Sequence, residues 1–215
     1  MCGYNGIDST PFGSVGPTEV GALREELGLA EVPVVSVFGR LAPWKGQQVL
    51  LKALAHLPGV HALLVGEALF GEDSYANALR EQATTLAVMD RVRFLGFRQD
   101  IPRLMRLSDV VVHTSIAPEP FGRVIVEGML ARRPVVATRA GGALEIIEDG
   151  VSGVLVPPGD PEVLAGVLAD LLANPAKARA LAEAGCSEAL QRFSLWNMLE
   201  GVAQQIGQVV TQGRC

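Results

Sequence analysis

Six short apolar segments alternate with helical patterns along most of this 215-residue chain, and this alternation strongly constrains the fold. Strands are expected at 34–38, 60–65, 92–95, 110–113, 134–138 and 153–156. Helices are expected between them at 47–56, 73–88, 101–107 and 124–131, with a further helix start at 141–145. Because each strand is apolar on both faces, helices must cover both sides of the sheet. The sequence predicts an α/β fold with a doubly wound, parallel, six-stranded Rossmann-like sheet.

The two ends of the chain differ from this central part. Residues 1–16 are rich in glycine and turn-forming residues and are expected to form a segment like an interdomain linker. Residues 17–193 are expected to form the Rossmann-like domain, and its pattern beyond Pro161 is all helical, with a break at Asn174-Pro175. In residues 194–215 an apolar stripe predicts a C-terminal helix that packs on this domain or on a missing N-terminal one.

Composition and charge narrow the possible functions. The net charge of −5 and the lack of a basic run argue against a nucleic-acid partner or a membrane surface. No apolar run reaches the ~20 residues that cross a bilayer, and no signal-peptide pattern is present. Cys2, Cys186 and Cys215 have neither metal-ligand nor redox spacing and are expected to be reduced thiols. The sequence thus predicts a cytoplasmic globular protein with no transmembrane segment and no metal site.

Glycines and charged residues follow the C-terminal ends of five expected strands. These groups are Gly39-Arg40 with Lys45, Gly66-Glu67, Gly96-Phe97, Glu119-Pro-Phe-Gly122 and Gly141-Gly142. In a parallel sheet these strand ends meet at one edge, and ligands bind there near the point where the strand order reverses. We therefore expect one crevice lined by five loops.

The stretch from Glu119 to Glu127 carries two carboxylates in different settings. Pro118 and Pro120 keep Glu119 in a loop, whereas Glu127 belongs to the opening turns of a helix. A loop that runs into a helix presents free N–H groups and the positive end of the helix dipole, which suits phosphate and sugar oxygens. On spacing alone, a surface glutamate and a solvated helix glutamate would be the simpler interpretation.

Taken in order, these motifs resemble the C-terminal, donor-binding half of the retaining glycosyltransferases of family four (glycosyl transferases group 1). The resemblance rests on Tyr4–Asp8 and Phe12, Gly39-Arg40 with Lys45-Gly46, Gly66-Glu67, Phe94–Gly96, Ser108-Asp109, Glu119–Gly122 with Glu127, and Gly141-Gly142 with Glu145. Complete enzymes of this family pair two Rossmann-like domains in the GT-B architecture. The resemblance implies a nucleotide-sugar donor, transfer of a hexosyl group to an unknown acceptor, and no metal or other cofactor. An N-terminal, acceptor-binding half is missing, so the chain alone is expected to be inactive, and any peripheral membrane contact would come through that half.

The resemblance also implies roles for individual residues. Arg40 and Lys45 contact the leaving diphosphate, whose growing negative charge requires fixed cations. Glu119 lies near the transferred sugar and completes the expected catalytic set. It is expected to hold the sugar and not to act as a nucleophile, because such enzymes are thought to use the leaving phosphate as base. The other expected nucleotide- or sugar-binding residues are Gly39, Gly66, Phe97, Phe121, Gly122, Arg123, Val124 and Glu127.

Within this set, the N–H groups of Phe121 and Gly122 are expected to bind sugar hydroxyls, and the helix that follows faces phosphate. Glu127 is expected to accept hydrogen bonds from ribose. Phe97 either brackets the nucleotide base or is a core ring. His113 ends a strand near the crevice and is assigned no role. The glycine pair at 141–142 either relieves a tight turn or faces the ligand.

Two other functions stay open on the sequence. A nucleotide-sugar epimerase of the hydrolysing type shares the two-domain architecture but releases its sugar without an acceptor. The pair Arg40 and Lys45, together with the glutamate spacing, argues against it. A non-catalytic nucleotide-binding or partner module is the second alternative, with the apolar stripe of the last helix as its interface.

Overall fold

Six parallel strands form one sheet in the order β3-β2-β1-β4-β5-β6, which confirms the predicted fold class. The computed structural model describes residues 5–212. The strands are β1 (Val34–Phe38), β2 (His61–Val65), β3 (Val92–Gly96), β4 (Val110–His113), β5 (Val135–Thr138) and β6 (Val154–Val156). The chain runs outward from β1 to β3 and then returns to the centre at β4. The strand order therefore reverses between β1 and β4, where open α/β sheets bind ligands.

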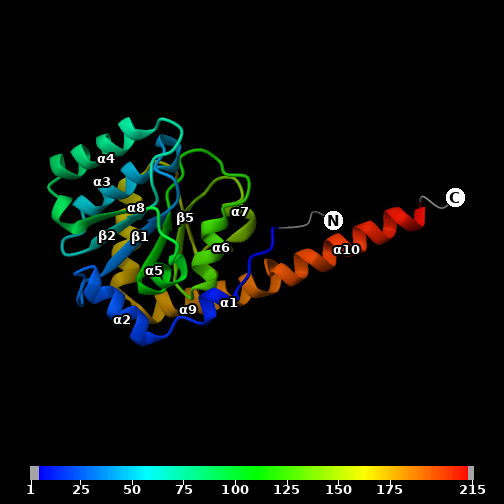
Figure 1. Cartoon of the computed structure of the whole chain (residues 1–215). Coiled ribbons are helices and arrows are strands. Elements are labelled where there is room, and N and C mark those ends of the chain that lie inside the picture. Colours follow the sequence, from blue (N-terminus) through cyan, green and yellow to red (C-terminus); the bar gives the residue numbers. More distant parts are fainter. Residues whose placement is uncertain (1–4, 213–215) are drawn as a thin grey trace.

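Helices cover both faces of the sheet (Figure 1). On one face lie α1 (Thr10–Gly13), α2 (Pro17–Glu26), α5 (Ile101–Leu107), α6 (Arg123–Leu130), α7 (Ala143–Ile146) and α9 (Pro175–Arg192). On the other face lie α3 (Gln47–Ala55), α4 (Asp73–Thr85) and α8 (Pro161–Ala173). Two 3₁₀ turns, η1 (Pro43–Lys45) and η2 (Met89–Arg91), complete the domain.

The central strand β1 is buried along its whole length because both of its faces meet helices. Val35 and Val37 pack with the α3 and α8 side, and Val34 and Phe38 pack with the α2 and α5 side. The buried Ser36 hydroxyl lies 2.6 Å from the hydroxyl of Ser108, which donates to the Leu104 carbonyl at 2.8 Å. This buried polar pair is therefore satisfied.

The expectation that every strand is apolar on both faces is wrong for β3. This strand lies at the edge of the sheet, where only Val92 is buried and Arg93 is half-exposed. An edge strand has one neighbour, so its side chains are only partly covered. Arg93 donates instead to the Asp90 carbonyl at 2.8 Å.

The segment before α2 is packed against the domain. Ile7 and Phe12 are buried in the core. The Ile7 N–H donates to the Phe193 carbonyl at 2.8 Å, and the Leu195 N–H donates to the Ile7 carbonyl at 3.2 Å. Sequence reasoning did not identify α2, although Pro17 at its first turn and the helix-forming residues that follow were available signals.

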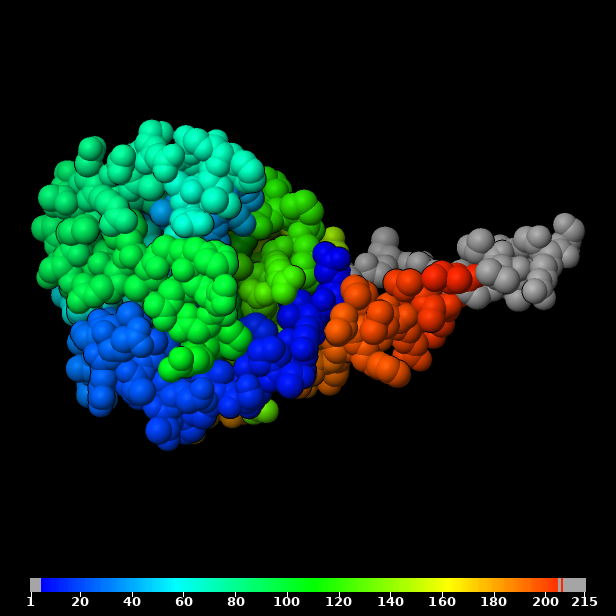
Figure 2. All heavy atoms as spheres, viewed as in Figure 1, coloured from blue at the N-terminus to red at the C-terminus, as the bar shows by residue number. Residues whose placement is uncertain are grey.

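Helix α10 (Leu195–Gln212) projects from the body of the domain (Figures 1 and 2). Its exposed apolar side chains are Leu195, Trp196, Leu199, Val202 and Ile206. Across the described part of the chain, no helix is long and apolar enough to cross a membrane. Cys186 is a buried free thiol, whereas Cys2, Tyr4 and Cys215 lie outside the described residues.

Candidate active site

The loops that follow β1 and β4 are joined at the point where the strand order reverses. Gly46 has a φ of +73°, and a Cβ at this position would lie 1.9 Å from the Thr114 carbonyl oxygen. The Thr114 hydroxyl donates to the Lys45 carbonyl at 2.9 Å, and the Ile116 N–H donates to the Trp44 carbonyl at 2.8 Å. Only glycine permits both this conformation and this close approach. The contact places Lys45 beside the β4 loop.

Three donors converge on one oxygen of Glu119. Lys45 Nζ lies 2.7 Å from Glu119 Oε1, and His113 Nε2 lies 2.8 Å from the same atom. The Ser115 hydroxyl also donates to Oε1. No donor among the described residues contacts Oε2, so the second carboxylate oxygen is available to a ligand. We call these four side chains the Glu119 cluster.

The Glu119 cluster determines the charge of its carboxylate. Burial would raise the pKa of Glu119, but hydrogen bonds from His113, Lys45 and Ser115 outweigh burial and lower this pKa to about 2. Glu119 is therefore ionised near neutral pH. A carboxylate with so low a pKa is a weak base and has no proton to donate. It is suited to accept hydrogen bonds, and His113 must carry its proton on Nε2 to bind it.

Gly141 and Gly142 support the backbone of the loop that carries Glu119. A Cβ on Gly141 would lie 2.3 Å from the Glu119 carbonyl oxygen, and a Cβ on Gly142 would lie 2.3 Å from that of Phe121. The Gly142 N–H donates to the Glu119 carbonyl at 2.8 Å. These glycines thus allow a close approach between two loops, which neither alternative from the sequence had described.

Arg40 is held by an ion pair and by aromatic rings. Its Nε lies 3.3 Å from Glu72 Oε2. Its guanidinium carbon lies 5.9 Å from the centre of the Trp44 ring and 5.2 Å from that of Phe70, within the range of cation–π contacts. Lys45 Nζ lies 4.5 Å from the Trp44 ring centre. Trp44 therefore contacts both predicted phosphate-binding cations.

The predicted glycines at the strand ends use their N–H groups within the fold. The Gly39 N–H donates to the Val65 carbonyl at 2.9 Å, and the Gly66 N–H donates to the Gly96 carbonyl at 2.8 Å. Phe97, next to Gly96, is 67% exposed. Of the two alternatives for Phe97, the core ring is therefore wrong.

The remaining predicted residues lie at the start of α6. Gly122 is the residue before its first turn, with a φ of +86°. Within this helix, Arg123 Nε lies 2.6 Å from Glu127 Oε1. The ring of Phe121 packs edge-on against Phe193, with ring centres 5.9 Å apart, so this ring serves the core. Ligand binding by the N–H groups at 121–124 and by Glu127 stays a prediction.

Sequence reasoning missed several residues of this edge. His113 was seen but given no role, and Ser115 was not singled out. The polar run His113-Thr114-Ser115, directly after an apolar strand, was the available signal. Glu72 and Phe70 had no such signal, because their position over Arg40 depends on the course of the loop after β2. Among the described residues, no group of three or more His, Cys, Asp or Glu side chains could hold a metal ion.

A parallel sheet in the order 3-2-1-4-5-6, with charged loops where the order reverses, defines the class of Rossmann-like domains that bind ligands at that edge. Residues 21–187 match the family model described as "Glycosyl transferases group 1", so the chain belongs to this family. The resemblance inferred from the motifs is thereby confirmed at the level of the family. The match does not favour the epimerase alternative.

Relatives and solved structures agree with this assignment. The chain is 37% identical over 165 residues to the lipopolysaccharide core biosynthesis glycosyltransferase LpsE of Rhizobium meliloti, covering 77% of this chain and 47% of that one. The crystal structure of Anabaena HepE in complex with UDP and glucose has a TM-score of 0.93 and 46% identity, covering 95% of this chain and 55% of that one. The chain thus spans about half the length of these relatives.

A third similarity concerns one domain alone. The crystal structure of the C-terminal domain of a group 1 family glycosyl transferase, LpcC from Francisella tularensis, has a TM-score of 0.77 and 26% identity. The match covers 88% of this chain and 100% of that one. The fold of this chain is accordingly the Rossmann-like half of a GT-B glycosyltransferase.

Proposed function

We propose that this chain is the nucleotide-sugar-binding half of a retaining glycosyltransferase, which transfers a hexosyl group from a nucleoside-diphosphate sugar to an acceptor. The observation that carries the proposal is the Glu119 cluster, in which Lys45 from the β1 loop meets Glu119 from the β4 loop. Its place where the strand order reverses supports the proposal. So does the similarity to Anabaena HepE, whose structure holds UDP and glucose.

The cations and the start of α6 would act on the leaving diphosphate. Negative charge develops on this group as the bond to the sugar stretches, and preorganised positive groups stabilise it. Arg40 supplies a planar fork and Lys45 a point charge. The N–H groups of Arg123 and Val124, at the positive end of α6, would add two further donors.

Glu119 would hold the transferred sugar. Its Oε1 is occupied by the cluster, whereas Oε2, which no donor among the described residues contacts, would accept a hydrogen bond from a sugar hydroxyl. Because its pKa lies at about 2, Glu119 is a poor general base and cannot be a general acid. Glu127 would accept from the ribose, with the exposed side chain of Arg123 giving way. The leaving phosphate itself would take the acceptor proton.

The acceptor would be bound by an N-terminal half that pairs with this one, and residues 1–16 would form the connection between them. The exposed apolar face of α10, within residues 194–215, would pack on that half. Without it the chain would bind donor but not transfer the sugar. We propose further that the reaction is metal-independent and cytoplasmic. The Francisella C-terminal domain supports independent folding of such a half.

Calorimetric titration with UDP, GDP and ADP tests donor binding directly. At least one nucleotide is expected to bind the isolated chain, and Arg40→Ala and Lys45→Met are each expected to weaken binding about tenfold or more. Lys52→Met is the matched control, because Lys52 is exposed on α3 outside the cluster. If none of the three binds at millimolar concentration, or if the Arg40 and Lys45 variants match the control, the proposal fails.

A further inference from the structure

A cavity of about 640 Å³ lies at the edge of the sheet opposite the Glu119 cluster. Its lining includes Pro33, Asp109 and Pro134, the residues that immediately precede β1, β4 and β5. Strand starts and strand ends lie at opposite edges of a parallel sheet, so a strand length, roughly 15 Å, separates the two sites. A cavity of this volume is within the range that holds a small molecule.

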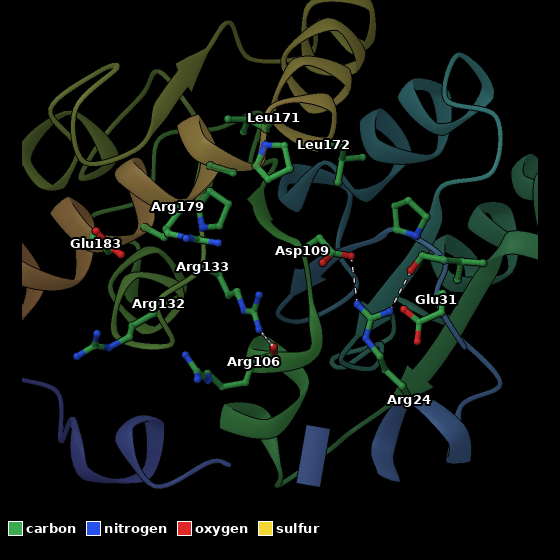
Figure 3. A pocket seen from close by; sticks show the side chains of 16 residues that line it. Arg24, Glu31, Arg106, Asp109, Arg132, Arg133, Leu171, Leu172, Arg179 and Glu183 are labelled. Atoms are coloured by element: carbon green, nitrogen blue, oxygen red, sulfur yellow. Dashed lines mark hydrogen bonds and ion pairs between the residues drawn. The ribbon is translucent and has the colours of Figure 1, made fainter. Parts of the chain in front are cut away.

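Arginine dominates the charged lining of this cavity (Figure 3). The lining holds three carboxylates and five arginines. The arginines are Arg24, Arg106, Arg132, Arg133 and Arg179. The lining therefore carries a surplus of two positive charges in a chain whose net charge is −5. The remaining wall is largely apolar and includes Leu171 and Leu172 of α8.

The carboxylates of the lining leave most of the arginines unpaired. Asp109 Oδ2 lies 3.2 Å from a guanidinium nitrogen of Arg24. It also accepts from the Val34 N–H at 2.8 Å. Glu31 and Glu183 are exposed, and within the described residues neither forms an ion pair with an arginine. Asp109 is thus shared between Arg24 and the backbone of Val34, and Glu31 and Glu183 do not bind an arginine of the lining.

Arg106 and Arg133 lie together, and among the described residues the hydrogen-bond acceptors of their guanidinium groups are backbone carbonyls. Arg106 donates to the Ala131 carbonyl at 3.1 Å, and Arg133 donates to the Arg106 carbonyl. The Nε donor of each is buried and has no hydrogen-bond partner in the part of the chain that the structure describes. Burial lowers the pKa of Arg133, and the nearby charges of Arg106 and Arg24 lower it further, whereas the charge of Asp109 opposes this. Because arginine stays charged in proteins, an anion in the cavity would relieve this repulsion.

Arg132 occupies a backbone position that favours glycine. It follows α6 with a φ of +53°. The Arg132 N–H donates to the Met129 carbonyl at 2.9 Å, and the Arg133 N–H donates to the Gly128 carbonyl at 3.2 Å. This pair of bonds is the Schellman motif, whose left-handed residue is usually glycine. Arg132 borders the cavity, but its side chain is exposed and its guanidinium points away from that of Arg133 (Figure 3).

We propose that this cavity binds a small molecule through a phosphate monoester group, held by Arg106 and Arg133, with its apolar part against α8. Guanidinium groups match the geometry of phosphate oxygens through paired N–H donors. The inference goes beyond the donor-binding function, because the cavity lies at the opposite edge of the sheet. A ligand here would not compete with a nucleotide.

The probe is glycerol 3-phosphate, titrated calorimetrically into the full chain with and without saturating UDP, and glycerol is the uncharged control. The ester is expected to bind in both cases and glycerol in neither. Binding is expected to fall about tenfold in Arg133→Met and in Arg106→Met, and to persist in Arg40→Ala and in Arg132→Gly. Arg132→Gly is also expected to raise the thermal midpoint, since it removes the left-handed strain. A thermal midpoint above the titration temperature in Arg106→Met and Arg133→Met excludes unfolding as the cause of the lost binding.

Vesicles that contain phosphatidic acid, compared with phosphatidylcholine vesicles, distinguish a lipid headgroup from a free ester. Retention of the chain on phosphatidic acid vesicles that is lost in Arg133→Met supports the site and identifies a lipid headgroup as the source of the phosphate. The proposal is overturned if neither glycerol 3-phosphate nor phosphatidic acid binds, or if binding is unchanged in Arg106→Met and Arg133→Met. It is also overturned if Arg40→Ala or UDP abolishes binding, because the probe then occupies the donor site.

Discussion

Lys45 and Glu119, which lie 74 positions apart in the sequence, form a 2.7 Å ion pair across the two loops where the strand order reverses. Both side chains are largely buried, so the contact is shielded from solvent far more than a surface pair. His113 and Ser115 share the same carboxylate oxygen. The pairing explains how an acidic residue can lie where a polyanionic leaving group is expected: its charge is already compensated by the protein.

The stability of the chain is expected to depend on the ionisation of Glu119. Its pKa falls from an ordinary value of 4.5 to about 2, so the stabilisation is present above about pH 4.5 and is lost as the pH falls toward 2. The shift corresponds to roughly 3 kcal/mol at neutral pH. Urea unfolding of the wild type and Glu119→Gln should differ by about this amount at pH 7 and by less than half of it at pH 3. An equal difference at both pH values would contradict this, and Glu81→Gln, an exposed change on α4, is the control.

Removing the partner of Arg40 is expected to strengthen nucleotide binding. Glu72 lies 3.3 Å from Arg40 Nε and would compete with the proposed diphosphate for the same guanidinium. A partly exposed ion pair contributes up to about 1 kcal/mol, so Glu72→Gln should tighten the binding of UDP by up to about fivefold. Asp73→Asn removes the same charge from the next residue and should have a smaller effect. Weaker binding in Glu72→Gln would instead mean that Glu72 positions Arg40 for the ligand.

Two glycine-to-alanine changes, each adding one methyl group, are expected to have opposite effects on the stability of the chain. Gly141→Ala would place a Cβ 2.3 Å from the Glu119 carbonyl at a φ of +56°. It should destabilise the chain by about 1–3 kcal/mol and weaken UDP binding. Gly166, within α8, has open space around it, and Gly166→Ala should stabilise by about 0.5–1 kcal/mol. Thermal unfolding measures both, and a neutral Gly141→Ala would show that the loop can move away.

Replacing Phe97 is expected to weaken nucleotide binding without loss of stability, whereas replacing Phe193 is expected to reduce stability. Phe97 is 67% exposed next to the end of β3, and Phe97→Ala should leave the thermal midpoint within about a degree while weakening nucleotide binding about threefold or more. Phe193 is fully buried and packs against Phe121, so Phe193→Ala should destabilise by about 3–5 kcal/mol. Unchanged UDP affinity in Phe97→Ala would exclude its ring from the base site.

The sequence was sufficient to predict the sheet because burial of a strand produces a local run of apolar residues. A strand such as β1, covered on both faces, is apolar at nearly every position, and glycine marks its end. The pairing of side chains that are distant in the sequence produces no such local pattern. The contact of Lys45 with Glu119 depends on the closeness of Gly46 to Thr114 across the sheet edge, and the ion pair of Arg40 with Glu72 depends on the loop after β2. Residue types were therefore predictable at the site, and pairings were not.

The arginine cavity could not be anticipated for the same reason. Its arginines come from α2, α5, α9 and the turn after α6, and each alone resembles an ordinary surface charge. Only the left-handed backbone at Arg132 distinguishes one of them, and φ is not visible in a sequence when the residue is not glycine.

The pairing of Ile7 with residues 193–195 has a mechanical consequence. The segment at residues 5–7 and helix α10 leave the domain side by side, fastened by hydrogen bonds from Ile7 to Phe193 and from Leu195 to Ile7. A body attached to both segments would be held by a double tether. Such a joint bends readily about one axis but resists twisting, because rotation would have to break the backbone pairing. Movements of the domain relative to such a body are therefore expected to be hinge-like.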